Sequence, residues 1–272
     1  MNAPGSQELL DLIGRRPSTL ELDRAALELA AIEYPGLDSS ASMAELDRIA
    51  FTIADRATDL SDGECFVETT NRYLFQELKF QGNSADYYHA DNSCLNRVLE
   101  TRTGIPLTLS LIYMEVARRL AKPVVGIGLP GHFVVRYEDE GYSAFIDPYH
   151  GGRLLDESGC AQLAQTENLT RDLLTPVDRR YVVMRMVNNL RQVYFSRREP
   201  AKAVRLLDLL IAADPACADE HKQRAVAMLM QHRSADALAG FRKYLELVPD
   251  APDRARIEEQ MRNLVHWLAA RN

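Results

Sequence analysis

The stretch from Thr101 to Leu155 constrains the fold of this chain more than any other part of the sequence. It opens with a Gly-Ile-Pro turn in which Pro106 suits the first position of a helix. Residues 107–120 are then apolar and continuous enough for a buried helix. Three short β-rich runs follow, at residues 124–129, 132–137 and 144–146. A buried helix that leads into a three-stranded antiparallel sheet predicts an α+β domain.

Amphipathic helices are expected on the N-terminal side of this stretch. Apolar residues recur at helical spacing in two segments between Ser18 and Ala57, and again over residues 63–79. A shorter helix is predicted after Asp91 or Asn92 as the cap, with Cys94 on its apolar face. We expect these helices to cover one side of the α+β domain.

The C-terminal part changes character at Thr175 and Pro176, after which helical periodicity continues almost to the end. The pair Ala203 and Pro215 recurs as Ala237 and Pro249, 34 residues later, which is the period of tetratricopeptide repeats. A helical bundle with an accidental period is the alternative. The pattern predicts two domains, residues 1–175 and residues 176–272, with a final capping helix over residues 251–270.

Composition excludes several classes of function. The net charge of −7 disfavours nonspecific binding to nucleic acid, which depends on clustered Lys and Arg. No run approaches the roughly 18 apolar residues of a membrane span, and the first residues contain no export signal. The four cysteines, at positions 65, 94, 160 and 217, form no CxxC pair and suggest neither disulfides nor a zinc knuckle. We therefore expect a cytoplasmic protein with free thiols.

Four segments, in order, resemble one protein family. They are FQGNSADYYHADNSCLNRVLETRTGIPLTLSLIYMEVARRL, GLPGHFVVR, IDPYHGGRLL and MRMVNNLRQVY. Together they are similar to the SirB-type family of bacterial proteins, which joins a transglutaminase-like domain to tetratricopeptide repeats. The resemblance implies a papain-type, cysteine-protease-like core and a bacterial origin, and it carries no established biochemical activity.

The resemblance also indicates which catalytic residues are present. Active transglutaminase-like enzymes use Cys, His and Asp in that chain order, with the cysteine at the N-terminus of the buried helix, where the helix dipole favours the thiolate. His132 resembles the family histidine and Asp147 the carboxylate that orients it. The position of the cysteine is taken by Pro106. Because proline has no nucleophilic atom, we expect the acyl transfer of the superfamily to be absent.

Three other residues could replace the missing cysteine as the nucleophile. Thr108 and Ser110 lie on the same helix, but their hydroxyls are expected to bond to the backbone. Cys94 is the strongest substitute, because its helix leads directly into the Gly-Ile-Pro turn and could approach His132. Its position in a stripe of leucines and valine favours a buried, inert thiol instead. A cysteine-type hydrolase or acyltransferase using Cys94 with His132 and Asp147 is therefore the alternative function.

A polar pocket is expected even without a nucleophile. Its candidate lining residues are Asn92, His132, Asp147, Tyr149 and His150. His132, Asp147 and His150 could instead ligate a divalent metal through imidazole and carboxylate groups, but their spacing matches no strong metal motif, so we expect neither metal nor cofactor. The favoured function is a noncatalytic, regulatory protein that binds a protein or peptide partner through its helical repeats.

Overall fold

The computed structural model describes residues 20–166 and 170–270, which form two compact units, residues 20–189 and residues 190–270. The chain passes from one unit to the other within helix α8 (Arg179–Ser196). The residues before Leu20, on which the expectation about an export signal rests, lie outside the described part. No helix in the described ranges is long and apolar enough to span a bilayer.

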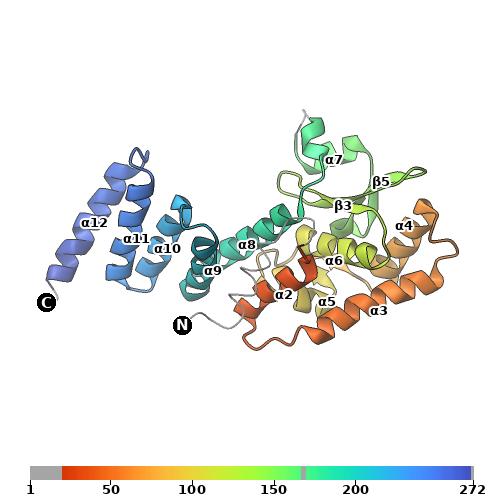
Figure 1. Ribbon diagram of the computed structural model, residues 1–272, viewed down its shortest axis with the longest axis horizontal. Helices are drawn as coiled ribbons and strands as arrows, with labels where there is room; N and C mark the ends of the chain where they lie inside the picture. Colours follow the sequence, from red (N-terminus) through yellow and green to blue (C-terminus); the bar gives the residue numbers. More distant parts are fainter. Residues whose placement is uncertain (1–19, 167–169, 271–272) are drawn as a thin grey trace. The chain divides into compact units, whose positions relative to one another are not determined.

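The buried helix predicted from the sequence is α6 (Pro106–Arg119), at the centre of the first unit. Twelve of its 14 residues are buried, and proline at its first position supplies a preset φ where no N–H is needed. Helices α2 (Leu22–Glu33) and α3 (Ser40–Arg56) pack on one side of α6, and a sheet packs on the other (Figure 1). The expected α+β architecture is confirmed.

The sheet contains four antiparallel strands in chain order rather than the three predicted. They are β3 (Val124–Ile127), β4 (Val134–Glu138), β5 (Ser143–Asp147) and β6 (Arg153–Leu155). Strand β6 escaped prediction because it has only three residues, and its Leu154 is exposed, so it shows no alternation of apolar and polar residues. The register pairs Val135 with Ile146, which sets the start of β4 beside the end of β5.

Helix α4 (Gly63–Asn71) continues as the π-helical turn η2 (Arg72–Glu77), within the helix predicted over residues 63–79. The cap predicted for the next helix is wrong. Asp91 and Asn92 lie in a 3-10 turn, η3 (Ala90–Ser93), and Cys94 is the residue that precedes α5 (Leu95–Thr101). A two-residue parallel pair, β1 (Gln81–Gly82) with β2 (Thr103–Gly104), also went unpredicted, because so short a ladder leaves no periodic pattern.

A smaller apolar cluster lies on the sheet face that carries α7 (Glu157–Leu163), the helix drawn beyond the sheet from α6 (Figure 1). The turn η5 (Arg171–Leu174) follows α7 in the chain. The buried members of the cluster are Ile127, Leu129, Val134, Cys160, Ala164 and Leu174. The sheet is therefore covered on both faces, and the residues at the ends of its strands are held by packing from two sides.

Buried charges join α2 to α6. Arg119 lies 2.9 Å from a carboxylate oxygen of Asp23 and 3.2 Å from one of Glu115, and both carboxylates are fully buried. Arg118 contacts the same two carboxylates at 3.1 Å and 2.7 Å. Burial, with the nearby charge of Asp23, raises the pKa of Glu115 to about 7. Burial also acts to raise the pKa of Asp23, but hydrogen bonds with Glu115 and Arg119 outweigh it and the pKa is lowered.

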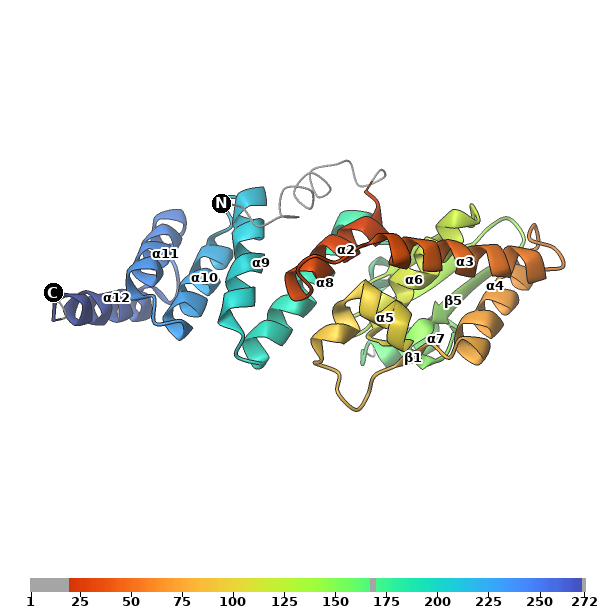
Figure 2. The same ribbon diagram turned by 90° about the horizontal axis from the view of Figure 1, so that it is seen from below.

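The second unit is helical, as predicted. Helices α9 (Pro200–Ala213), α10 (Ala218–Met230), α11 (Ser234–Leu247) and α12 (Arg254–Ala269) each pack on the next (Figure 2). Helix α11 begins 34 positions after α9, which matches the period found in the sequence. Helices α10 and α11 approach closely at Gly240, where an added Cβ would lie 2.9 Å from that of Ala225. The assignment of these helices to tetratricopeptide repeats stays a prediction.

Candidate functional site

The site begins with two residues that the sheet brings together. His132 lies two positions before β4, after Gly131, whose φ of +67° suits the turn, and Asp147 is the last residue of β5. The antiparallel pairing of β4 with β5 places their side chains together, with His132 Nε2 at 3.0 Å from Asp147 Oδ1. Both side chains are buried. The sequence predicted this histidine–aspartate pair through its family resemblance.

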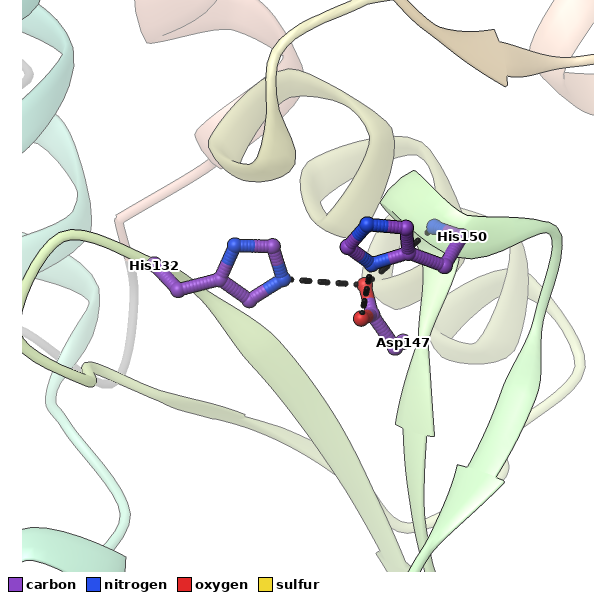
Figure 3. A group of neighbouring side chains, drawn as sticks. All are labelled: His132, Asp147 and His150. Carbon is purple, nitrogen blue, oxygen red and sulfur yellow. Dashed lines mark hydrogen bonds and ion pairs between the residues drawn. The ribbon is translucent and has the colours of Figure 1, made fainter. Parts of the chain in front are cut away.

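The carboxylate of Asp147 also holds the turn η4 (Pro148–His150). Its Oδ1 accepts hydrogen bonds from the backbone N–H groups of Tyr149 and His150, at 3.1 and 3.4 Å. Its Oδ2 lies 2.6 Å from Nδ1 of His150, so the two imidazoles approach one carboxylate from different directions (Figure 3). Burial acts to raise the pKa of Asp147, but hydrogen bonding and the charges of the two histidines lower it overall.

The tautomer of His132 follows from this bond. Because Nε2–H donates to Asp147, Nδ1 is left as an unprotonated acceptor, and no hydrogen bond to it comes from residues 20–166 or 170–270. The start of α6 lies nearby, since the Ser110 hydroxyl donates to the carbonyl of Phe133 at 3.3 Å. A histidine so arranged can accept a proton or a hydrogen bond from a bound group.

No nucleophile stands at the start of α6. Pro106 is buried there and offers no reactive atom. The Thr108 hydroxyl donates to the carbonyl of Asn92 at 2.6 Å and accepts from the N–H of Ile105 at 3.2 Å. The Ser110 hydroxyl donates to the carbonyl of Phe133, so the hydroxyls of both Thr108 and Ser110 are hydrogen-bonded to backbone groups.

Cys94, the substitute nucleophile of the alternative function, is fully buried. It occupies the N-cap position of α5, and its backbone carbonyl accepts from Arg97 and Val98. Its sulfur is thus closed to solvent, whereas a catalytic thiol needs access to substrate.

Asn92 does not offer its amide to the site. Its Nδ2 donates to the carbonyls of Asp86 and Tyr87, at 2.7 and 3.1 Å, and its Oδ1 accepts from Asn83 at 3.1 Å. These bonds organise the loop between β1 and η3. Asn92 is therefore a scaffold for that loop.

Tyr149 lies between the loop and the histidines. Its ring contacts those of His132 and His150 at centroid distances of 5.8 and 5.0 Å, and a Cβ on Gly82 would come within 2.4 Å of it.

Two exposed aromatic residues of the loop between β1 and η3, Tyr87 and Tyr88, were not predicted from the sequence. Partial desolvation of its hydroxyl, with the nearby Tyr149, raises the pKa of Tyr87. Adjacent tyrosines in an otherwise polar segment were the available signal.

Cys65 is expected to react first with a thiol reagent. Its sulfur lies 3.4 Å from the Thr58 hydroxyl, and this hydrogen bond lowers its pKa, whereas Asp214 raises the pKa of Cys217 to about 12. Limited iodoacetamide at neutral pH should modify Cys65, and peptide mass spectrometry should find Cys94 and Cys160 unmodified before denaturation. The Cys65→Ser variant is the control. Rapid labelling of Cys94 that depends on His132 would instead support the cysteine-type enzyme.

Comparison with known proteins places these observations in a family. Residues 40–188 match the model of the transglutaminase-like superfamily. A UPF0162 protein of Xylella fastidiosa (strain Temecula1) is 32% identical over 239 residues, 85% of each chain. Protein SirB1 of Salmonella typhimurium is 23% identical over 228 residues, 82% of this chain and 84% of that protein. Human F-box only protein 21 is 35% identical over 132 residues, 46% of this chain and 21% of that protein.

The match covers α3 to α8 and includes the buried helix, the sheet and the His132–Asp147 pair. The similarity to the UPF0162 and SirB1 proteins extends over most of both chains, as the resemblance of the four sequence segments predicted. This chain belongs to the transglutaminase-like superfamily and is a homologue of the SirB1 and UPF0162 proteins.

Proposed function

We propose that this chain is a noncatalytic transglutaminase-like protein of the bacterial cytoplasm, which binds a protein or peptide partner through its helical repeats. The observation that carries the proposal is Pro106 at the start of α6, in a domain that keeps the His132–Asp147 pair. Covalent acyl transfer needs a thiolate at the helix N-terminus, within reach of the histidine. A buried Cys94 supports the same reading and disfavours the cysteine-type alternative.

A groove on the second unit supports partner binding. It lies between α11 and α12 and has a volume of about 340 Å³. Its apolar walls come from Leu238, Met261 and Val265, and its charged rim from Arg242, Glu258, Arg262 and His266. Val265 is 47% exposed, which is unusual for a large aliphatic side chain on a packed helix.

The charge of the rim indicates the chemistry of the partner. Glu258 is paired with Arg254 at 2.8 Å, so the remaining field of the groove comes mainly from Arg242 and Arg262. An apolar groove with a cationic rim fits a peptide that combines apolar side chains with acidic ones.

A charge placed in the groove should weaken peptide binding. We expect peptides enriched in acidic and apolar residues when a displayed library is selected on the full-length chain. Val265→Asp should weaken the selected peptides by about tenfold or more, because it buries a carboxylate in the groove and repels an acidic ligand. Ala255→Asp is the matched control, since Ala255 is exposed on the same helix outside the groove. Equal binding to the two variants, or no enrichment, would contradict the proposal.

A further inference from the structure

We infer that His132, Asp147 and His150 form a binding site for a divalent transition-metal ion of the zinc type. Each residue offers one ligand atom, and the three atoms lie within 4.8 Å of one another. The sequence raised these three residues as an alternative metal site but did not favour it, because their spacing matches no metal motif. Their spacing is irregular because they come from a turn before β4, the end of β5 and the turn η4. Only the pairing of β4 with β5 brings these segments together (Figure 3).

The spacing of the donor atoms fits a single ion. Two ligands about 2.1 Å from one metal, at tetrahedral or octahedral angles, lie about 3.0 to 3.4 Å from each other. His132 Nε2 is 3.0 Å from Asp147 Oδ1, and His150 Nδ1 is 2.6 Å from Oδ2. The three donor atoms lie within 4.8 Å of one another, so the imidazoles must rotate to bring both nitrogens to the separation of about 3.0 to 3.4 Å expected around one ion.

The donor types select the metal. Two imidazoles with one carboxylate suit Zn²⁺ and its first-row neighbours, whereas Mg²⁺ and Ca²⁺ prefer oxygen ligands alone. Both imidazoles can bind without a net loss of protons. The proton of His132 moves from Nε2 to Nδ1, and that of His150 moves from Nδ1 to Nε2, so that each ring presents a lone pair to the ion.

Access and rigidity also agree with a metal site. Asp147 is fully buried, but the side chain of His150 is 49% exposed, which leaves room for water to complete the coordination. The backbone bonds from Tyr149 and His150 to Asp147 fix the turn that carries the third ligand. Gly152 secures the far end of this turn with a φ of +75°, at a place where a Cβ would lie 2.5 Å from the Phe75 ring.

The presence of His150 distinguishes this site from a His–Asp pair in which the carboxylate only orients the histidine. A His–Asp pair needs only His132 and Asp147, and the second imidazole on the other carboxylate oxygen adds nothing to that orientation. It does supply the third protein ligand, the number typical of zinc sites that keep an open position. The inference does not rest on the groove of the second unit. A metal bound here would also leave proline, rather than a nucleophilic cysteine, at position 106.

The test uses the full-length chain after removal of metals with a chelator. We expect isothermal titration with ZnCl₂ to show one ion per chain, and bound Co²⁺ to show a visible absorption band. His150→Ala should weaken Zn²⁺ binding by about tenfold or more, because it removes a ligand. His89→Ala is the matched control, since His89 is another partly exposed histidine beside an aspartate, at 3.7 Å from Asp91.

The outcomes separate cleanly. Loss of binding in His150→Ala but not in His89→Ala supports the site. Failure of the parent chain to bind Zn²⁺, or binding that His150→Ala leaves unchanged, overturns it. Neither result changes the expected effect of Val265→Asp on peptide binding, so the metal-site proposal and the peptide-binding proposal can fail separately.

Discussion

Replacing Asp147 with alanine is expected to lower the free energy of unfolding by about 3 to 5 kcal/mol, because the change strips a buried hydrogen-bonded cluster of its common acceptor. The carboxylate accepts from two imidazoles and from two backbone N–H groups, all at the junction of β5 and η4. Without it, the buried side chain of His132 and the backbone N–H groups of the turn lose their hydrogen-bond acceptor.

Urea unfolding followed by circular dichroism would measure the loss for Asp147. Asp147→Asn should cost less, because the amide keeps the volume and one acceptor oxygen. His150→Ala should cost about 1 kcal/mol or less, since that side chain is half-exposed and removing it leaves the other bonds of Asp147 in place. A loss below about 1 kcal/mol in Asp147→Ala would show that the cluster contributes little to stability.

Arg119→Met is expected to be the second large change, with a loss of about 3 kcal/mol at pH 8. Arg119 lies against the fully buried carboxylates of Asp23 and Glu115. Methionine keeps much of the apolar stem but removes the charge that compensates them, and Arg118 alone is left in close contact with both.

The loss should shrink at acid pH. The folded-state pKa of Glu115 is about 7, above the ordinary value of 4.5, so its contribution to stability is full below about pH 4.5 and is lost as the pH rises through 7. Removal of Arg119 raises that pKa further. At pH 5.5 Glu115 in the variant binds a proton and one buried charge disappears. In the parent chain the pKa of Asp23 is lowered, so between pH 5.5 and 8 Asp23 stays ionised in the folded and unfolded states and adds no slope.

Urea unfolding curves of the parent chain and Arg119→Met at pH 5.5 and pH 8 would test whether the loss of stability is smaller at the lower pH. Asp47→Asn is the control, because Asp47 also contacts Arg119, at 2.6 Å, but is exposed. Its effect should be small at both pH values. A loss for Arg119→Met that is equal at the two values would show that Glu115 does not take up a proton in the variant.

Local patterns predicted the main elements of the fold but not its short ones. The run over residues 107–120 could be identified as a buried helix because it is long and mostly apolar, and twelve of the 14 residues of α6 are buried in the structure. The positions of β3, β4 and β5 followed from clusters of β-branched and aromatic residues. Strand β6 has only three residues, and the two-residue strands β1 and β2 pair with each other across about twenty residues of chain, so none of them shows a local pattern.

For the candidate site, too, some residues could be predicted from the sequence and others only from the structure. His132 and Asp147 were recognised from the family resemblance, while the role of His150 depends on the η4 turn, which exists because Asp147 accepts its backbone N–H groups. Asn92 was predicted to line the pocket, because the sequence shows an amide without showing where it bonds. In the structure, that amide is used by the loop around Asp86 and Tyr87.

The proline at the start of α6 has a consequence for the history of the chain. Pro106 is well suited to its place, because the first helical position needs no N–H donor and proline restricts the unfolded chain. No single-base change converts a proline codon into a cysteine codon, and the intermediates would put serine or arginine at the start of a buried helix. Selection for folding therefore favours retention of the proline over the two base changes that a thiol at this position would need.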